Sequence, residues 1–315
     1  QGLDELYYQS LGRVVELGKK DWSDVYALVM GVLLAARESL TEEQIGAFTN
    51  LKESVIWNCL NDLQQFLDET ESEDEETLYK LYHQSVTDFL SKRRLKVDKN
   101  KVKNRYYLPS DEQHQRLLAY YHPEDVPWDE VKLENIDDYG RRHLAQHLVK
   151  AEQVEELHTL LSLEKGEKSA WFKLKDDEGD TAGFLTDLEL AWSQADAASE
   201  RELGRSVGLQ CRYALIKASI NSLSEIPKEL LIALVKYPNP YWTAAKALAY
   251  ARQVPDPKQR FENLAALSRE LPDSEPLKLQ ALQSSLDAAS AIQDEGYRAQ
   301  ALTALSDKLT PELLP

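Results

Sequence analysis

An extended run turns into an amphipathic helix in the stretch Leu81-Tyr82-His83-Gln84-Ser85-Val86-Thr87-Asp88-Phe89-Leu90. Apolar side chains recur there at spacings of three and four residues and so share one helix face: Tyr82, Val86, Phe89 and Leu90. His83 stands at the start of the helix, where unpaired backbone N–H groups favour an anion. The pattern alone allows two interpretations of His83. It is either a buried histidine with its hydrogen bonds satisfied at a strand–helix junction, or part of an anion-binding site.

The residues before this stretch follow the order of a winged helix. Helical spacing predicts a connecting helix over residues 1–20, then helices over 25–38, from Thr41, and over 53–66. Thr41 with Gln44 three residues later forms a capping box. Two β-like runs follow, at 66–67 and 78–82. The acidic segment between them, residues 68–77, is predicted to be a disordered wing tip.

A repeat with a constant offset marks the last part of the chain, as 294 − 256 = 38. The first copy has Leu248, Ala251, Asp256, Arg260, Leu264, Ala266, Leu267, Ser268 and Leu271, which match Leu286, Ala289, Asp294, Arg298, Leu302, Ala304, Leu305, Ser306 and Leu309. Each copy is a helix, a turn and a helix that ends near Pro272 or Thr310-Pro311. Such pairs bury their apolar faces by stacking, so they predict an α-solenoid. Asp256 and Asp294 fit helix N-caps, with Arg260 and Arg298 placed to pair with them.

The expected fold is therefore mainly α: a winged helix with a small β-wing, a helical domain, and an α-solenoid of helix-pair repeats. The expected domains are a connecting helix at 1–20, a winged-helix domain at 21–108, a helical domain at 109–165 and a repeat domain at 166–315. The polar segment 176–183 fits a domain boundary. Because the chain begins with Gln and ends soon after a solenoid helix, we expect it to be part of a longer polypeptide.

The net charge of the chain excludes some classes of binding partner. With 54 acidic against 37 basic residues, the net charge is −17, which opposes binding to nucleic acid or to an anionic membrane. The expected recognition helix carries one cation, Lys52, and no apolar run is long enough to span a membrane. Two distant cysteines favour a reducing cytoplasm. The basic run 91–105 is interpreted as a contact to an acidic partner or nucleotide, or as a solvated loop that partly neutralises the wing.

The sequence contains no recognisable catalytic motif. Residues 165–169 lack the adjacent Gly-Lys pair of a phosphate-binding loop. His143 and His147 are four residues apart, as in metal-binding helices, but Leu144 replaces the glutamate of HExxH and no third ligand is evident. We expect both histidines to pack or hydrogen-bond at a helix surface, and we expect no intrinsic enzymatic activity.

Residues 82–90 resemble the hydrophobic–His–x–x–φ–x–Asp–φ motif of STAND signal-transduction ATPases, the NACHT and NB-ARC relatives of the apoptosome protein and of innate immune receptors. In that family the motif lies in a winged helix, and its histidine contacts the β-phosphate of ADP. The resemblance implies that His83 binds this cofactor, with ADP or ATP and Mg held by a nucleotide-binding domain outside this chain. Residues 139–151 are also similar to the helical domain of bacterial members, so the resemblance covers residues 1–163.

Two functions follow as hypotheses. In the first, the chain is the regulatory and sensing part of a STAND-type ATPase: the winged helix holds the ADP-bound state against the upstream ATPase domain, and the repeats bind a protein or ligand trigger. The resemblance also implies oligomerisation on activation. In the second, the chain is a helical-repeat scaffold for protein partners without a nucleotide role. DNA-binding regulation is a third, disfavoured by charge.

Overall fold

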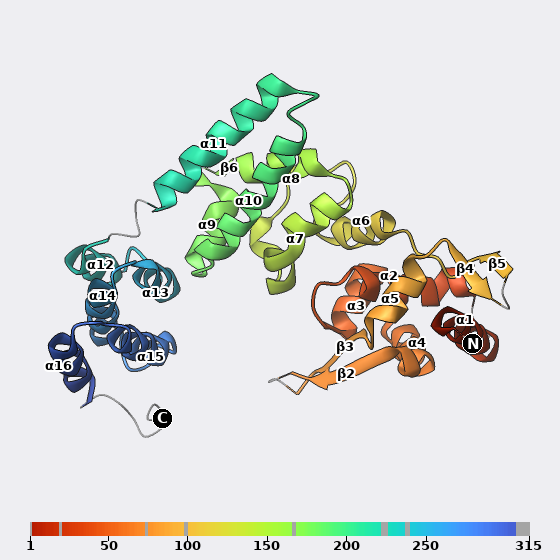
Figure 1. The fold of residues 1–315 in the computed structure, drawn as a ribbon, viewed down its shortest axis with the longest axis horizontal. Helices are drawn as coiled ribbons and strands as arrows, with labels where there is room; N and C mark the ends of the chain where they lie inside the picture. The colour runs from red at the N-terminus through yellow and green to blue at the C-terminus, as the bar shows by residue number, and fades with distance from the viewer. Residues whose placement is uncertain are drawn as a thin grey trace. The chain divides into compact units, whose positions relative to one another are not determined.

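The computed structural model describes residues 2–18, 21–72, 75–97, 100–165, 168–221, 226–236 and 240–306. These residues form two compact units, Gln1–Thr159 and Leu160–Pro315 (Figure 1). Both are mainly helical, and the strands are short and antiparallel. The predicted fold class is confirmed, while the four finer domain boundaries stay predictions.

The first unit opens with the winged helix. Its elements are α1 (Leu3–Gly18), the π-helical η1 (Trp22–Tyr26), α2 (Ala27–Ala35), β1 (Leu40–Thr41), α3 (Glu42–Thr49), α4 (Glu53–Leu63), the 3-10 turn η2 (Gln64–Phe66), β2 (Leu67–Glu71), β3 (Thr77–Leu81) and α5 (Gln84–Ser91). The sheet order is β1-β3-β2, with β2 at an edge. The capping box is confirmed: Gln44 N donates to Thr41 Oγ1 at 3.2 Å, and Thr41 N donates to Gln44 Oε1 at 3.0 Å.

The motif helix α5 packs into this core through three of its four predicted apolar positions. Val86, Phe89 and Leu90 are buried, and the Tyr7 ring of α1 lies 5.7 Å from the Phe89 ring. Tyr82 is 58% exposed, contrary to prediction. The helix begins two residues after it, so Tyr82 does not share the helical face.

The acidic wing, residues 68–76, is more ordered than predicted. Strand β2 continues to Glu71, which pairs with Thr77, and residues 73–74 lie outside the described part. An edge strand can pair its backbone on one side while its charged side chains stay in water. The acidic composition therefore does not prevent strand formation here. Lys80 Nζ also lies 3.1 Å from Asp68 Oδ2 across the pair.

The basic run forms a hairpin instead of the predicted loop. Strand β4 (Arg94–Val97) pairs antiparallel with β5 (Asn100–Lys103). Leu95 is buried opposite Val102, and this apolar face anchors the hairpin on the unit. The remaining helices of the unit are α6 (Ser110–Tyr121), η3 (Leu133–Asn135) and α7 (Asp138–Lys150), and α8 (Val154–Ser162) crosses its boundary.

The second unit holds the helix pairs. It contains the β6–β7 hairpin (Glu164–Lys165 and Lys168–Ser169), α9 (Ala170–Asp177), α10 (Thr181–Ala197), α11 (Leu203–Asn221), α12 (Lys228–Val235), α13 (Ala244–Gln253), α14 (Pro257–Glu270), α15 (Leu277–Ser290) and α16 (Glu295–Ser306). The predicted repeat corresponds to α13–α14 and α15–α16. Its second predicted end, 310–311, lies outside the described residues.

The two repeats begin their second helices in the same way. Gln259 N donates to Asp256 Oδ1 at 2.8 Å, and Tyr297 N donates to Asp294 Oδ1 at 2.7 Å, so both predicted N-caps are confirmed. Arg298 was expected to pair with Asp294, but it lies 3.9 Å from Glu295 and donates to the Ile292 carbonyl. The Asp294 carboxylate is instead engaged by the backbone of its own helix.

Residues 176–183, expected at a domain boundary, form the α9–α10 turn inside the second unit. The buried Asp176 accepts a hydrogen bond from Thr181 Oγ1 at 3.0 Å and pairs with Lys246 of α13. Next to it, the buried Lys175 Nζ lies 2.6 Å from Asp187 Oδ2. Buried charges need such partners, so this polar segment joins helices instead of separating domains.

We predict that Asp187→Ala lowers the free energy of unfolding by about 3–5 kcal/mol, because it leaves the Lys175 ammonium buried without its partner. Chemical denaturation followed by circular dichroism measures this. Glu189→Ala is the matched control: it breaks an exposed contact to Lys217, for which the expected loss is below about 1 kcal/mol. Equal losses in both variants would contradict the prediction.

Candidate functional site

His83 lies at the predicted junction, between the end of β3 and the start of α5. It is the N-cap residue of α5, with an extended backbone (φ −152°, ψ 147°), and its side chain is exposed. Ser85 N donates to His83 Nδ1 at 3.1 Å.

 The His83 side chain therefore satisfies one of the unpaired backbone N–H groups at the start of α5.

A hydrogen-bonded relay connects this ring to α1. Ser85 Oγ lies 2.8 Å from His83 Nδ1, and Tyr7 OH lies 2.7 Å from Ser85 Oγ. A backbone N–H can only donate, so Nδ1 must accept and carries no proton. In the neutral ring the proton then sits on Nε2, for which the described part of the chain supplies no hydrogen-bond partner. His83 thus presents an N–H donor at the surface.

The neighbours of His83 favour a shared site over a complete pocket. The exposed Tyr82 ring lies 5.8 Å from the imidazole, centroid to centroid. Asp88, the acidic residue of the motif, accepts from Gln84 Nε2 at 3.1 Å on the exposed side of α5. One N–H donor beside an aromatic ring can contact an acceptor oxygen, but it needs further donors from another surface to hold a phosphate group.

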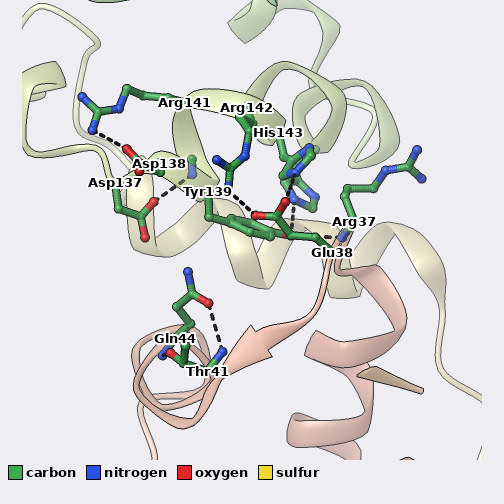
Figure 2. Close-up of polar contacts among 12 residues, drawn as sticks. Arg37, Glu38, Thr41, Gln44, Asp137, Asp138, Tyr139, Arg141, Arg142 and His143 are labelled. Carbon is green, nitrogen blue, oxygen red and sulfur yellow. Dashed lines mark hydrogen bonds and ion pairs between the residues drawn. The ribbon is translucent and has the colours of Figure 1, made fainter. Parts of the chain in front are cut away.

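A second polar cluster, which the sequence did not predict as a unit, lies inside the first unit between α6, α7 and the loop after α2; Figure 2 shows its Arg37 and Tyr139. His147 is fully buried, so it belongs to the core and not to the helix surface where it was expected. Its Nδ1 lies 2.8 Å from Nδ1 of the buried His114 on α6. Its Nε2 lies 3.0 Å from Tyr139 OH, which accepts from Arg37 N at 3.3 Å.

These contacts fix an order of protons. Two Nδ1 atoms in contact require one donor and one acceptor, so the two neutral rings are different tautomers. If Tyr139 OH donates to His147 Nε2, then His147 Nδ1–H donates to His114 Nδ1, and each donor from Arg37 N to His147 has an acceptor, with His114 Nε2–H at the end of the row. The opposite order leaves the Tyr139 proton without an acceptor in this row. We therefore assign the Nδ1–H form to His147.

His143 is held apart from this row, although it lies on the same helix. Its Nε2 is 3.4 Å from Glu38 Oε2, and Arg142 Nη2 lies 2.6 Å from Glu38 Oε1 (Figure 2). The loop after α2 is thus tied to α7 by one carboxylate. Among the described residues, no group of three or more His, Cys, Asp or Glu side chains is arranged to hold a metal ion.

Burial keeps the histidine pair neutral. Desolvation, with smaller contributions from Lys150 and Arg37, lowers the pKa of His114 to about 4. Desolvation and the neighbouring His114, His143 and Arg37 lower the pKa of His147 to about 3. Desolvation also lowers the pKa of His143, although Glu38 opposes this shift. The cluster is therefore a neutral hydrogen-bonded row at physiological pH.

Sequence patterns contained signals for the residues that were missed. His114 stands at three, four and seven residues before Leu117, Leu118 and Tyr121, which places it on the buried face of α6. Ser85 stands two residues after His83, where its N–H can reach a capping side chain. The contact of Tyr7 with Ser85 spans 78 residues, and no local pattern predicts it.

Other candidate segments have local structural roles. The rejected phosphate-loop candidate, residues 165–169, falls in the β6–β7 hairpin, with 166–167 outside the described residues. Cys59 is buried and Cys211 is exposed, and neither forms a disulfide within the described part of the chain. None of the described helices is both long enough and apolar enough to cross a membrane.

Comparison of the chain with models of protein families, with curated proteins and with solved structures gives no match. Any functional conclusion therefore depends on the geometry of the sites described above.

We predict that acid weakens the first unit between pH 6.5 and 4. Both histidines have lowered pKa values when folded, so the unfolded chain takes up protons that the folded chain does not. Stability is present above the unfolded pKa and is lost as the pH falls, by about 1–2 kcal/mol per histidine at pH 5. Denaturant midpoints measured across this range test it.

His114→Gln removes one of the two titrations and retains polar atoms beside His147, so we expect about half of the wild-type acid loss. Gln115→Ala, an exposed neighbour on α6, should keep the full loss. An identical pH profile in His114→Gln and in the wild type would show that the row does not cause the acid sensitivity.

A second prediction concerns the tautomers, which nitrogen-15 NMR distinguishes well above the usual histidine pKa of about 6.5. His83 should give the Nε2–H pattern, because its Nδ1 accepts from Ser85 N. His147 should give the Nδ1–H pattern and His114 the Nε2–H pattern. An Nδ1–H signal from His83 would exclude the surface donor described here.

Proposed function

We propose that the chain is the regulatory and sensing part of a STAND-type nucleotide-switch ATPase, with His83 as a contact to the phosphate of bound ADP. The observation that carries this proposal is the outward Nε2–H donor of His83, preset by Ser85 on a winged helix. The nucleotide, with Mg, is held by an ATPase domain upstream in the same polypeptide. The chain itself contributes binding and no catalysis, and acts in the cytoplasm.

The chemistry of the donor supports this role. A phosphate oxygen is an acceptor only, so it matches an imidazole whose proton is fixed on the outer nitrogen. Tyr7 and Ser85 hold the ring in this state before the ligand arrives, which reduces the entropy lost on binding. The His83 contact would stabilise the ADP-bound inactive state. Its loss would shift the population toward the state in which the ATPase domain exchanges nucleotide.

The repeats supply the sensing half of the proposal. The turns at the starts of α14 and α16 line a pocket of about 650 Å³, which includes Lys258 and Tyr297. Lys258 Nζ lies 3.9 Å from the centre of the Tyr297 ring, and Tyr297 OH donates to Glu262 Oε1 at 2.5 Å. Such a hollow, with aromatic and charged walls, suits a protein segment or ligand trigger.

The test uses a polypeptide in which an ATPase domain precedes residue 1. After purification and denaturation, released ADP is quantified for the wild type and for His83→Ala. We expect bound ADP in the wild type and a loss of about ten- to hundredfold in affinity for the variant, as for one charge-assisted hydrogen bond of about 1.5–3 kcal/mol.

Gln84→Ala is the matched control, because it changes the next exposed side chain and keeps the cap of α5. Ser85→Ala should give a smaller loss than His83→Ala, since the backbone N–H that orients Nδ1 remains. Equal ADP in the wild type and His83→Ala would make His83 a structural cap. Absence of nucleotide in every sample would favour the helical-repeat scaffold for protein partners.

A further inference from the structure

The hairpin of β4 and β5 places like charges directly opposite one another. Arg94 pairs with Lys103, and Lys96 pairs with Lys101, so four cations share one exposed face. Like charges in opposed positions lower the stability of an antiparallel pair. The four opposed cations therefore destabilise the hairpin that carries them.

No acidic side chain of the described residues offsets this face. None of the four cations forms an ion pair within the part of the chain that the structure describes. Neighbouring cations are engaged instead: Lys92 Nζ lies 2.9 Å from Asp4, and the Arg93 and Arg105 guanidinium groups lie over tyrosine rings. The basic hairpin, residues 92–105, has eight Lys or Arg and one Asp, so its net charge is 8 − 1 = +7.

The same unit contains a segment of opposite charge. The acidic wing has seven Asp or Glu among its nine residues and no cation. Glu69, Glu71, Glu75 and Glu76 are exposed. The formal charge of the wing, −7, is therefore opposite to that of the basic hairpin, +7, and each segment has one charge paired elsewhere, Asp68 with Lys80 and Lys92 with Asp4.

The described parts of the two segments form no ion pair with each other and lie apart in the structure. In Figure 1 the strands β2 and β3 and the β4–β5 hairpin lie on opposite sides of the winged-helix part of the first unit, with α4 and α5 between them. Within a single chain the basic hairpin is therefore not in contact with the described part of the wing. Its complement must come from another molecule.

We propose that the basic hairpin binds the acidic wing of a second copy of this chain. The two surfaces differ and lie at opposite ends, so the contact is head-to-tail and leaves one hairpin and one wing free in each pair. Further copies can then add to form a chain or a ring. This proposal does not depend on a nucleotide contact of His83.

A second copy fits the hairpin better than a nucleic acid does. An extended polyanion such as a nucleic acid would reach beyond the hairpin. There it would be repelled by the rest of the chain, whose net charge is −17 overall. A protruding wing brings its charge to the hairpin alone. At about 0.1 M salt the Debye length is about 10 Å, so contacts between the two segments persist while the net repulsion of the two chains is screened.

The test measures self-association of the complete chain by sedimentation velocity over a range of concentrations at about 0.1 M and about 1 M salt. We expect association at the lower salt that is lost at the higher. Arg94→Gln/Lys103→Gln and Glu69→Gln/Glu71→Gln should each weaken it about tenfold, from several exposed pairs of about 0.2–1 kcal/mol each. Lys52→Gln/Lys132→Gln, with the same charge change at other exposed sites, should retain it.

Mixing the hairpin variant with the wing variant separates this interface from a general charge effect. Each variant keeps one intact surface, so the mixture should form a complex of one copy of each and nothing larger. A wild-type chain that stays monomeric at about 0.1 M salt would overturn the proposal. So would unchanged association of the hairpin variant, or hairpin-dependent binding of an RNA or DNA oligonucleotide without self-association.

Discussion

The need of a helix to satisfy its first backbone N–H groups organises much of this structure. Most described helices with a side-chain cap use a short polar residue: Thr41, Asp137, Ser169, Asp180, Thr243, Asp256 and Asp294. At α5 a histidine has this role. A carboxylate cap has no proton to direct, whereas a neutral imidazole that accepts at one nitrogen carries its proton on the other. A local requirement of helix geometry thus sets the chemistry of a surface atom.

Buried polar groups follow the same rule in both units, by different means. In the first unit, His114, His147 and Tyr139 remain neutral and pass hydrogen bonds along a row. In the second, Lys175 and Asp187 are charged groups 2.6 Å apart, and Trp171 Nε1 adds a donor to the same carboxylate oxygen at 2.8 Å. Each arrangement satisfies groups that would otherwise be costly to bury, and each joins helices that are separate in sequence.

The sequence predicted features that depend on near neighbours and missed those that depend on distant ones. The capping box at Thr41, the caps at Asp256 and Asp294 and the strand–helix junction at His83 were all predicted from local spacing. Composition misled at the acidic wing and the basic run, because an edge strand and a hairpin can pair their backbones while charged side chains remain hydrated. The row from Arg37 to His114 could not be predicted, because its members meet only after α6 and α7 pack.

The acidic edge of the winged-helix sheet has a consequence for solubility. An uncovered edge strand exposes backbone donors and acceptors that can template strands from other molecules and lead to aggregation. On β2, Asp68, Glu69 and Glu71 place negative charge along that edge. A second identical edge is repelled before backbone pairing begins. The charge thus protects this sheet edge from amyloid-like growth.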